Sequence, residues 1–177
     1  QYTELQRSMA SGARIFELLD IEPAIKDSPG AIELPPLKGE IKFDHVSFSY
    51  VPGIEVLHDI NLTVEPGEMV ALVGRTGAGK SSLINLSARF YDLEEGQIAV
   101  DGYNVASVTQ DSLRSQIGIV PQDPFLFSGT IEDNIRYGRL DASRQDIIDA
   151  ARAAGVDEFI SHLEHGYDTL VGERGGN

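Results

Sequence analysis

The stretch GRTGAGKSS, residues 74–82, holds the residues whose types and spacing are best suited to chemistry. It matches the pattern G-x-x-x-x-G-K-S and lies between a continuous apolar run and an amphipathic segment. Because Gly74, Gly77 and Gly79 have no Cβ, the backbone there can curl with its N–H groups pointing inward. The pattern therefore predicts a loop that binds phosphate at the start of a helix.

The side chains of this loop complete the expected site. Lys80 supplies a point charge for the terminal phosphates, and the Ser81 hydroxyl can ligate a Mg²⁺ ion that bridges two phosphates. An ordinary glycine-rich turn is the alternative interpretation, and the full pattern in this setting argues against it. The residues expected to contact the nucleotide are Gly74, Thr76, Gly77, Ala78, Gly79, Lys80, Ser81 and Ser82.

The loop identifies neither the base nor the reaction, because kinases, G proteins and motor ATPases share it. No N-K-x-D guanine motif occurs in the sequence. Hydrolysis also needs a second apolar strand that ends in an acidic residue, and the candidate IAVDG ends at Asp101. Asp101 and Gly102 form a strong turn dipeptide and no glutamate follows, so a structural turn is favoured over a Mg²⁺ ligand. We therefore expect the residues needed for hydrolysis to be absent from these 177 residues.

Elements that could position this loop follow from the apolar periodicity. Alternation or continuous apolar runs predict strands in five segments: residues 41–50, 56–64, 69–73, 96–102 and 117–122. The run at 69–73 is continuous, which is typical of a buried strand. Helical spacing follows the loop to residue 91, and the chain beyond residue 123 turns helical. Two capping boxes are expected there, Thr130 with Asp133 and Ser143 with Asp146.

Composition limits the class of protein. A hydrophobic fraction of 41% and a charged fraction of 24% are ordinary for a globular domain. The net charge of −14 would repel a phosphate backbone, so we expect no nucleic-acid partner. The absence of cysteine excludes disulfides and thiolate metal sites. No apolar run approaches the roughly 18–20 residues of a membrane span, and no signal peptide is recognisable.

Segments along nearly the whole chain share one family pattern. They are GEIKFDHVSFSY, VLHDINLTVEPGEMVALVGRTGAGKSSLINL, ARFYD, GQIAVDG, SLRSQIGIVPQDPFLFSGTIEDNI and VGERGGN. In this order they resemble the nucleotide-binding domain of an ATP-binding-cassette (ABC) exporter with membrane helices fused ahead of it. The resemblance implies an α/β fold: a P-loop NTPase-type ABC ATPase core with an antiparallel β subdomain and part of a helical subdomain. Ser87 and Leu93 stand where the family more often has Leu and Pro.

The resemblance implies roles for residues outside the loop. Tyr50 resembles the aromatic residue that stacks on adenine; alone, it would be interpreted as a core tyrosine at a strand end. Gln122 resembles the glutamine that contacts Mg²⁺ and the attacking water. Gln122 and Lys80 are thus the expected catalytic residues, and Ser81 and Gln122 the expected metal ligands. Segments at Phe125 to Phe127 and around Glu173 resemble the surfaces that meet the membrane domain.

A four-part organisation follows from the resemblance and the composition. Residues 1–22, in which Leu5, Met9, Gly12, Phe16 and Leu19 share one helical face, resemble the end of the last membrane helix and its connector. Residues 23–38 read as a linker, because prolines and glycines interrupt them. Residues 39–122 would form the ATP-binding core, and residues 123–177 part of the helical subdomain.

The family pattern implies a function and partners. ATP and Mg²⁺ are the expected ligands, and two such domains, as a homodimer, would clamp ATP and drive export of a substrate. The domain would lie at the cytoplasmic face of the cell membrane, joined to its membrane domain in the same chain. Two alternatives stay open: the cassette of a transporter without fused membrane helices, and a non-catalytic nucleotide-binding module.

Several family motifs are expected beyond Asn177. GERGGN is followed in the family by the signature LSGGQ, an acidic strand and a switch histidine. None of the histidines present is assigned the switch role; these are His45, His58, His162 and His165. We expect no ATP turnover from these 177 residues alone. Because the acidic strand would lie beside residues 69–73, we also expect the piece by itself to be poorly stable or prone to aggregate.

Overall fold

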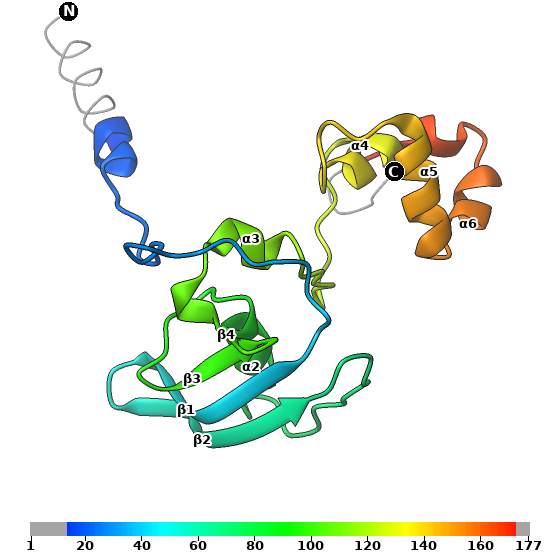
Figure 1. Ribbon diagram of the computed structural model, residues 1–177. Helices are drawn as coiled ribbons and strands as arrows, with labels where there is room; N and C mark the ends of the chain where they lie inside the picture. The colour runs from blue at the N-terminus through cyan, green and yellow to red at the C-terminus, as the bar shows by residue number, and fades with distance from the viewer. Residues whose placement is uncertain (1–13, 173–177) are drawn as a thin grey trace, which may run out of the picture. The chain divides into compact units, whose positions relative to one another are not determined.

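The computed structural model of the chain describes residues 14–172 and divides into two units, Gln1–Gly118 and Ile119–Asn177 (Figure 1). Each unit has its own hydrophobic core and is described by itself. The four-part organisation expected from the sequence stays a prediction.

An antiparallel sheet of four strands, in the order β2-β1-β3-β4, forms the first unit's framework (Figure 1). Its strands are β1 (Ile41–Val51), β2 (Ile54–Val64), β3 (Glu95–Val100) and β4 (Tyr103–Asn104). The strands predicted at residues 41–50 and 56–64 are confirmed, and the strand predicted at residues 96–102 forms as far as Val100, where the turn at residues 101–102 begins. The turn between β1 and β2 needs a left-handed residue, which Gly53 supplies with a φ of 84°.

Helix α2 (Lys80–Ser87) covers the buried side of this sheet with its apolar face. Leu83 and Leu86 of α2 belong to one buried cluster with the inward residues of the sheet; these are Phe43, Val46, Phe48, Leu57, Ile98 and Val100. The 3-10 turn η1 (Val105–Ser107) and helix α3 (Gln110–Arg114) close the cluster, and Leu113 is fully buried in it. Packing against the sheet therefore fixes the position of α2.

Two predicted strands do not form. Residues 69–73 and 117–122 are in neither helix nor strand, so these two predictions are wrong. Their apolar side chains are open to solvent, with exposed fractions of 97% for Met69, 94% for Val73 and 94% for Val120. The physical reason is pairing: a continuous apolar strand needs hydrogen-bonded neighbours at its edges. No such neighbour pairs with either segment within residues 14–172.

Residues 25–40, which we call the strap, contain a turn at residues 29–30 and are hydrogen-bonded to the rest of the first unit. The N–H of Leu34 donates to Ser112 Oγ at 3.0 Å, and the N–H of Leu37 donates to Gln116 Oε1 at 2.9 Å. Ile32 and Val108 form an isolated parallel bridge. The linker expected from composition therefore packs along α3 (Figure 1).

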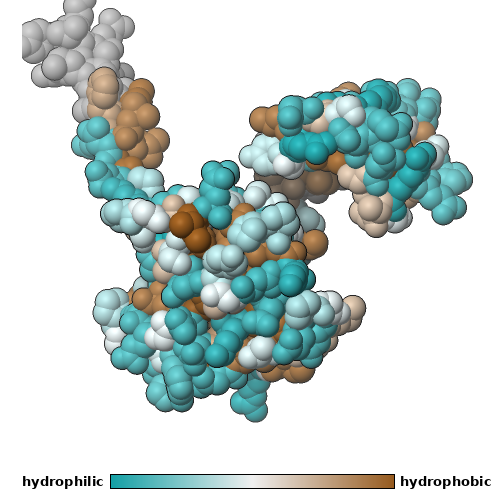
Figure 2. All heavy atoms as spheres, viewed as in Figure 1, coloured by the Kyte–Doolittle hydropathy of each residue, from teal (hydrophilic) through white to brown (hydrophobic). Residues whose placement is uncertain are grey.

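N-terminal to the strap, residues 14–19 are helical. Phe16 and Leu19 of the predicted apolar face are exposed, and Figure 2 shows the hydrophobic side of this short helix at the surface. Leu5, Met9 and Gly12 lie outside the described residues. Among the residues described, no helix is long and apolar enough to cross a membrane.

Short helices and one small sheet make up the second unit. Strands β5 (Gly129–Thr130) and β6 (Leu170–Val171) pair antiparallel. The remaining elements are α4 (Ile131–Arg136), α5 (Arg144–Ala153), α6 (Asp157–Ser161) and η2 (Gly166–Asp168). Both predicted capping boxes are confirmed at the starts of α4 and α5. The core consists of Ala142, Ile147, Ala151, Ile160 and Tyr167.

Candidate nucleotide-binding site

The start of α2 carries unsatisfied backbone donors. Its N-cap is Gly79, whose φ of 81° lies in the left-handed region, and no side chain caps the helix. The first turn contains no acidic residue. The first N–H groups of a helix have no partner within it, and the helix dipole makes this end attractive to anions. The local structure thus offers what a phosphate group requires.

Two glycines give the loop its shape. Gly77 has a φ of 82° and Gly79 a φ of 81°, conformations that other residues rarely adopt. At Gly79 a Cβ would lie 2.6 Å from Leu57 Cδ2 and 3.1 Å from the carbonyl oxygen of Val56. At Gly77 a Cβ would meet nothing within 4 Å. Gly79 therefore serves two purposes, a left-handed turn and close approach of α2 to β2.

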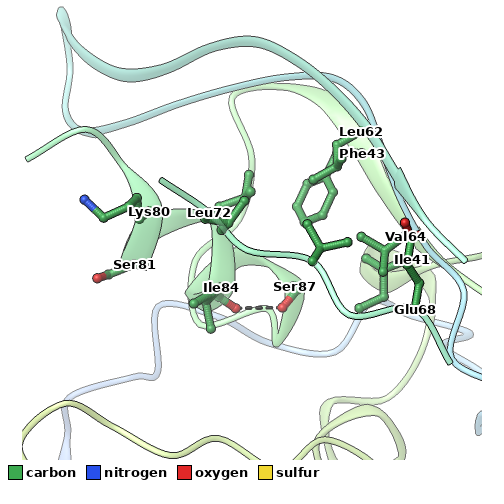
Figure 3. A pocket seen from close by; sticks show the side chains of 12 residues that line it. Ile41, Phe43, Leu62, Val64, Glu68, Leu72, Lys80, Ser81, Ile84 and Ser87 are labelled. Carbon is green, nitrogen blue, oxygen red and sulfur yellow. Dashed lines mark hydrogen bonds between the residues drawn. The ribbon is translucent and has the colours of Figure 1, made fainter. Parts of the chain in front are cut away.

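Lys80 and Ser81 lie at the open end of the helix. The Lys80 ammonium donates to the carbonyl oxygens of Gly74 at 2.9 Å and Arg75 at 2.8 Å, so the positive charge is held over the loop. Ser81 is exposed, whereas Ser82 is buried. Figure 3 shows Lys80 and Ser81 pointing away from Phe43 and Val64. These positions fit an oxygen-rich ligand such as a Mg²⁺-bound phosphate chain.

An apolar cavity of about 550 Å³ lies beside the site, between α2 and the sheet (Figure 3). Its walls come from both strands, the segment after β2, and α2: Ile41, Phe43, Leu62, Val64, Glu68, Val70, Leu72, Lys80, Ser81, Leu83, Ile84 and Ser87. Such a lining does not suit a polyanion. The space adjoins residues 69–73, which lack strand partners, and we assign it no ligand.

The structure brings Tyr50 to the predicted loop. The Tyr50 hydroxyl donates to Ser82 Oγ at 2.9 Å, and the residue is 47% exposed. Its ring meets two other aromatic rings edge-on, Phe48 at 4.8 Å and Tyr91 at 5.0 Å between centroids. The exposed ring is thus fixed next to the start of α2, where a nucleotide base could stack on it.

Gln122 belongs to the second unit, and Ser81 to the first. Gln122 is exposed. Because the two residues belong to different units, their pairing at one metal ion stays a prediction. Within residues 14–172 no group of three His, Asp or Glu side chains could hold a metal ion.

The segment after Gln122 carries an exposed aromatic cluster. The rings of Phe125 and Phe127 lie 5.0 Å apart, and that of Tyr137 lies 4.5 Å from Phe127. Asn134 fixes the segment, because its Oδ1 accepts from the Phe127 N–H at 2.8 Å and its Nδ2 donates to the Phe127 carbonyl at 3.0 Å. Glu173 lies outside the described residues.

Asp101 forms the predicted turn with Gly102. Its carboxylate accepts hydrogen bonds from the backbone N–H groups of Lys38, of Glu40 at 2.8 Å and of Gly39 at 3.2 Å. The Lys38 N–H, followed by those of Glu40 and Gly39, lowers the pKa of the Asp101 carboxyl. The carboxylate is engaged by the strap, which agrees with a structural turn.

Sequence reasoning missed the residues that support the site. Tyr91 and Phe48 hold the Tyr50 ring, and Arg89 follows α2 as a buried charge. Arg89 and Tyr91 lie in ARFYD, a segment used only for its resemblance to the family. The aromatic partners of Tyr91 and the strap partner of Arg89 lie far away in sequence, so spacing alone gave no signal for these contacts.

Comparison with known proteins agrees with this geometry. The family model described as ABC transporter matches residues 57–174. A fatty acid ABC transporter ATP-binding/permease protein of Mycobacterium tuberculosis is 49% identical over 176 residues, which are 99% of this chain and 28% of the relative. ATP-binding cassette sub-family B member 6 of Homo sapiens is 49% identical over 98% of this chain and 21% of its own length.

A solved structure gives the same result at the level of the fold. A bacterial Atm1-family ABC exporter with ATP bound matches with a TM-score of 0.84 and 45% identity, over 98% of this chain and 31% of the other. The chain therefore spans less than a third of the length of these relatives. The α/β ABC ATPase fold is shown by the family model and by this structural match. The chain belongs to the ABC transporter family.

Proposed function

We propose that the chain is the ATP-binding part of an exporter, in which ATP binding and hydrolysis drive a substrate across a membrane. The observation that carries the proposal is the arrangement at the start of α2. There an uncapped helix end, two left-handed glycines, the Lys80 ammonium and the Tyr50 ring lie together. Similarity to ABC exporters and to ATP-binding/permease proteins supports the transport part of the proposal.

Each feature has a task in binding. The N–H groups at the start of α2 hold the phosphates, and Lys80 adds charge at the terminal phosphates. Tyr50 stacks on the adenine, a contact that uses the base's π face. Ser81 and Gln122 would hold Mg²⁺, which would supply positive charge to the phosphate groups. Gln122 also orients the attacking water.

The longer polypeptide supplies the remaining parts. We place its nucleotide-binding domain at the cytoplasmic face of the cell membrane, with the exposed rings of Phe125 and Phe127 and the region of Glu173 docking on the membrane domain. A second nucleotide-binding domain, as a homodimer, completes each ATP site. We expect the 177 residues alone to give no turnover.

Binding of Mg-ATP to the full-length polypeptide tests the proposal. Lys80→Ala removes a charge-assisted contact worth about 1.5–3 kcal/mol, so we expect roughly 10- to 150-fold weaker binding in titration calorimetry. Lys42→Ala is the matched control, since Lys42 is an exposed lysine outside the loop. Equal affinity of the Lys80→Ala variant and the parent would contradict the phosphate-loop assignment.

A further inference from the structure

Arg89 follows α2 closely and is buried. Its side chain is only 5% exposed, and its φ of 51° lies in the left-handed region, which is unusual for a residue with a side chain. A buried guanidinium loses hydration and must be compensated by partners. The partners of the Arg89 guanidinium therefore indicate which contacts offset the cost of its left-handed backbone and its burial.

The guanidinium joins the end of α2 to the strap. Its Nη2 donates to the carbonyl oxygen of Lys26 at 3.1 Å, and Asp27 Oδ1 lies 4.0 Å from Nη1. On the other side, Nε donates to Asp92 Oδ1 at 3.1 Å and Nη1 to the carbonyl oxygen of Val108 at 3.4 Å. The Arg89 side chain thus contacts both the strap, which precedes it in the sequence, and residues that follow it.

The end of α2 is also bound to α3. Arg114 Nε donates to the carbonyl oxygen of Ala88 at 3.1 Å, and Nη2 donates to that of Arg89 at 2.6 Å. The Arg114 guanidinium lies 5.0 Å from the centre of the Phe90 ring. These bonds satisfy carbonyl groups that a helix end leaves free. A displacement of α2 along its axis must therefore move its neighbours as well.

The strap is bonded to α3 beside Arg89. Asp27 Oδ1 accepts from the Gln110 N–H at 3.0 Å and from Gln110 Nε2 at 3.1 Å. The backbone N–H of Gln110 lowers the pKa of the Asp27 carboxyl, so the carboxylate that faces Arg89 is ionised. Further along, Gln116 Nε2 donates to the carbonyl oxygen of Pro35 at 3.2 Å. Just beyond the end of α2, Lys26 and Asp27 of the strap contact Arg89.

We propose that Arg89 is a positioning residue that couples the nucleotide-binding end of α2 to the strap. This rests on the proposed function. Lys80 and Ser81 begin the helix and Arg89 follows its end, so ligand contacts at one end and strap contacts at the other act on one short rigid element. Nucleotide binding tightens the hold of Arg89 on Lys26 and Asp27. The strap then carries the response toward residues 14–24, which precede the core.

The alternative is that Arg89 only stabilises the fold. A glycine would make the left-handed turn without strain, and apolar side chains would fill the space without burying a charge. The choice between the two depends on whether the strap responds to nucleotide.

Hydrogen exchange measured by mass spectrometry on the full-length polypeptide, with and without Mg-ATP, separates these cases. In the parent we expect slower exchange in the loop of residues 74–82 and also, by about fivefold or more, in the strap. Arg89→Lys keeps the charge but loses the fork of donors. In this variant we expect the loop to be protected as before and the strap to show no response.

Two further variants complete the experiment. Asp27→Ala removes a partner from the exposed side of the strap and leaves Arg89 in place, so it reports even if Arg89→Lys folds poorly; we expect the same loss. The control is Arg152→Lys, which changes an exposed, ion-paired arginine of α5; this variant should respond like the parent.

If exchange in the parent's strap does not change with nucleotide while the loop is protected, the coupling is overturned. A strap response that persists in a folded Arg89→Lys variant overturns the role of Arg89, whatever Asp27→Ala shows, because Asp27 also bonds Gln110. Absence of loop protection in the parent contradicts the proposed function instead.

Discussion

Alanine substitution of the three glycines at the phosphate loop separates backbone conformation from crowding. Gly74 has an ordinary φ, but its added Cβ would lie 3.2 Å from Ala78 Cβ, closer than an ordinary van der Waals contact, so Gly74→Ala measures mild crowding without a conformational cost and should cost at most about 1 kcal/mol. Gly77→Ala places a Cβ in open space at a φ of 82° and should cost about 1–2 kcal/mol for the left-handed conformation. The first two variants thus calibrate the third.

Gly79→Ala meets both penalties. Its φ of 81° carries the same conformational cost, and the Cβ would lie 2.6 Å from Leu57 Cδ2. Overpacking of this kind adds about 1–3 kcal/mol, so the total is roughly 2–5 kcal/mol. Because Val56 and Leu57 belong to β2, the strain should push the start of α2 away from the sheet.

Hydrogen exchange of the α2 amides without nucleotide measures these differences in the full-length polypeptide. Relative to Gly77→Ala, exchange in Gly79→Ala should be faster by about 5- to 150-fold, the equivalent of the crowding cost. Leu57→Val removes Cδ2 and should recover part of that difference in a double-mutant cycle. Equal acceleration in Gly77→Ala and Gly79→Ala, or no recovery with Leu57→Val, would refute close approach as the reason for Gly79.

Three further predictions concern the ring, the strap and the unpaired segments. Tyr50→Ala should weaken ATP binding by the roughly 1–3 kcal/mol of a stacked base, whereas Tyr50→Phe, measured by the same titration, should keep most of the affinity. The pKa of Asp101 is lower in the folded state than its ordinary value, so its contribution to stability is present above that value and disappears as the pH falls through the folded-state pKa. Exchange at residues 38–40 should therefore accelerate, relative to the intrinsic rate, in strong acid; Asp101→Asn should show much of that acceleration at neutral pH, and an unchanged pattern would contradict the assignment. The exposed side chains of Met69 and Val73 should make the isolated 177-residue chain associate in light scattering. A monomer with a cooperative melt above about 45 °C would count against that expectation.

Local signals in the sequence predicted much of the first unit. The loop, α2 and the hairpin of β1 and β2 follow from patterns within short windows, in which glycine conformation, alternation and helical spacing agree. The capping boxes at Thr130 and Ser143 are equally local, since each joins residues three apart. For these elements, the residues that determine the structure are sequence neighbours.

The two missing strands show where local patterns fail. Residues 69–73 have the composition of a buried strand, but a strand forms only when other segments pair with its edges. Periodicity measures the preference of a segment and contains no information about the presence of its partner. The side chains of Met69 and Val73, exposed at 97% and 94%, record the missing pairing in this chain.

Side-chain contacts between residues far apart in the sequence were also not predicted. Residues 23–38 were predicted to be a linker because proline and glycine interrupt them. Within this stretch, bonds to Arg89 and Gln110 join residues 63 to 85 positions apart. Composition describes what a segment cannot form, such as a helix, and extended backbone remains free to bond elsewhere. Burial of a charged side chain indicates such long-range contacts better than composition does. Arg89, which is 4% exposed, needs partners that compensate for its lost hydration.

Helix α2 begins at a motif that the sequence predicts and ends at side-chain contacts that the sequence does not predict. Its start, at Gly79 and Lys80, is determined by a motif that chemistry makes recognisable from sequence alone. Its middle packs on the sheet through Leu83 and Leu86, and its end is held by Arg89 and by Arg114 of α3. A ligand bound at the N-terminal end of α2 would therefore act on a helix whose C-terminal end is joined to the strap through Arg89. The residues proposed to bind nucleotide and the strap are therefore joined through α2 and Arg89, as the proposed coupling requires.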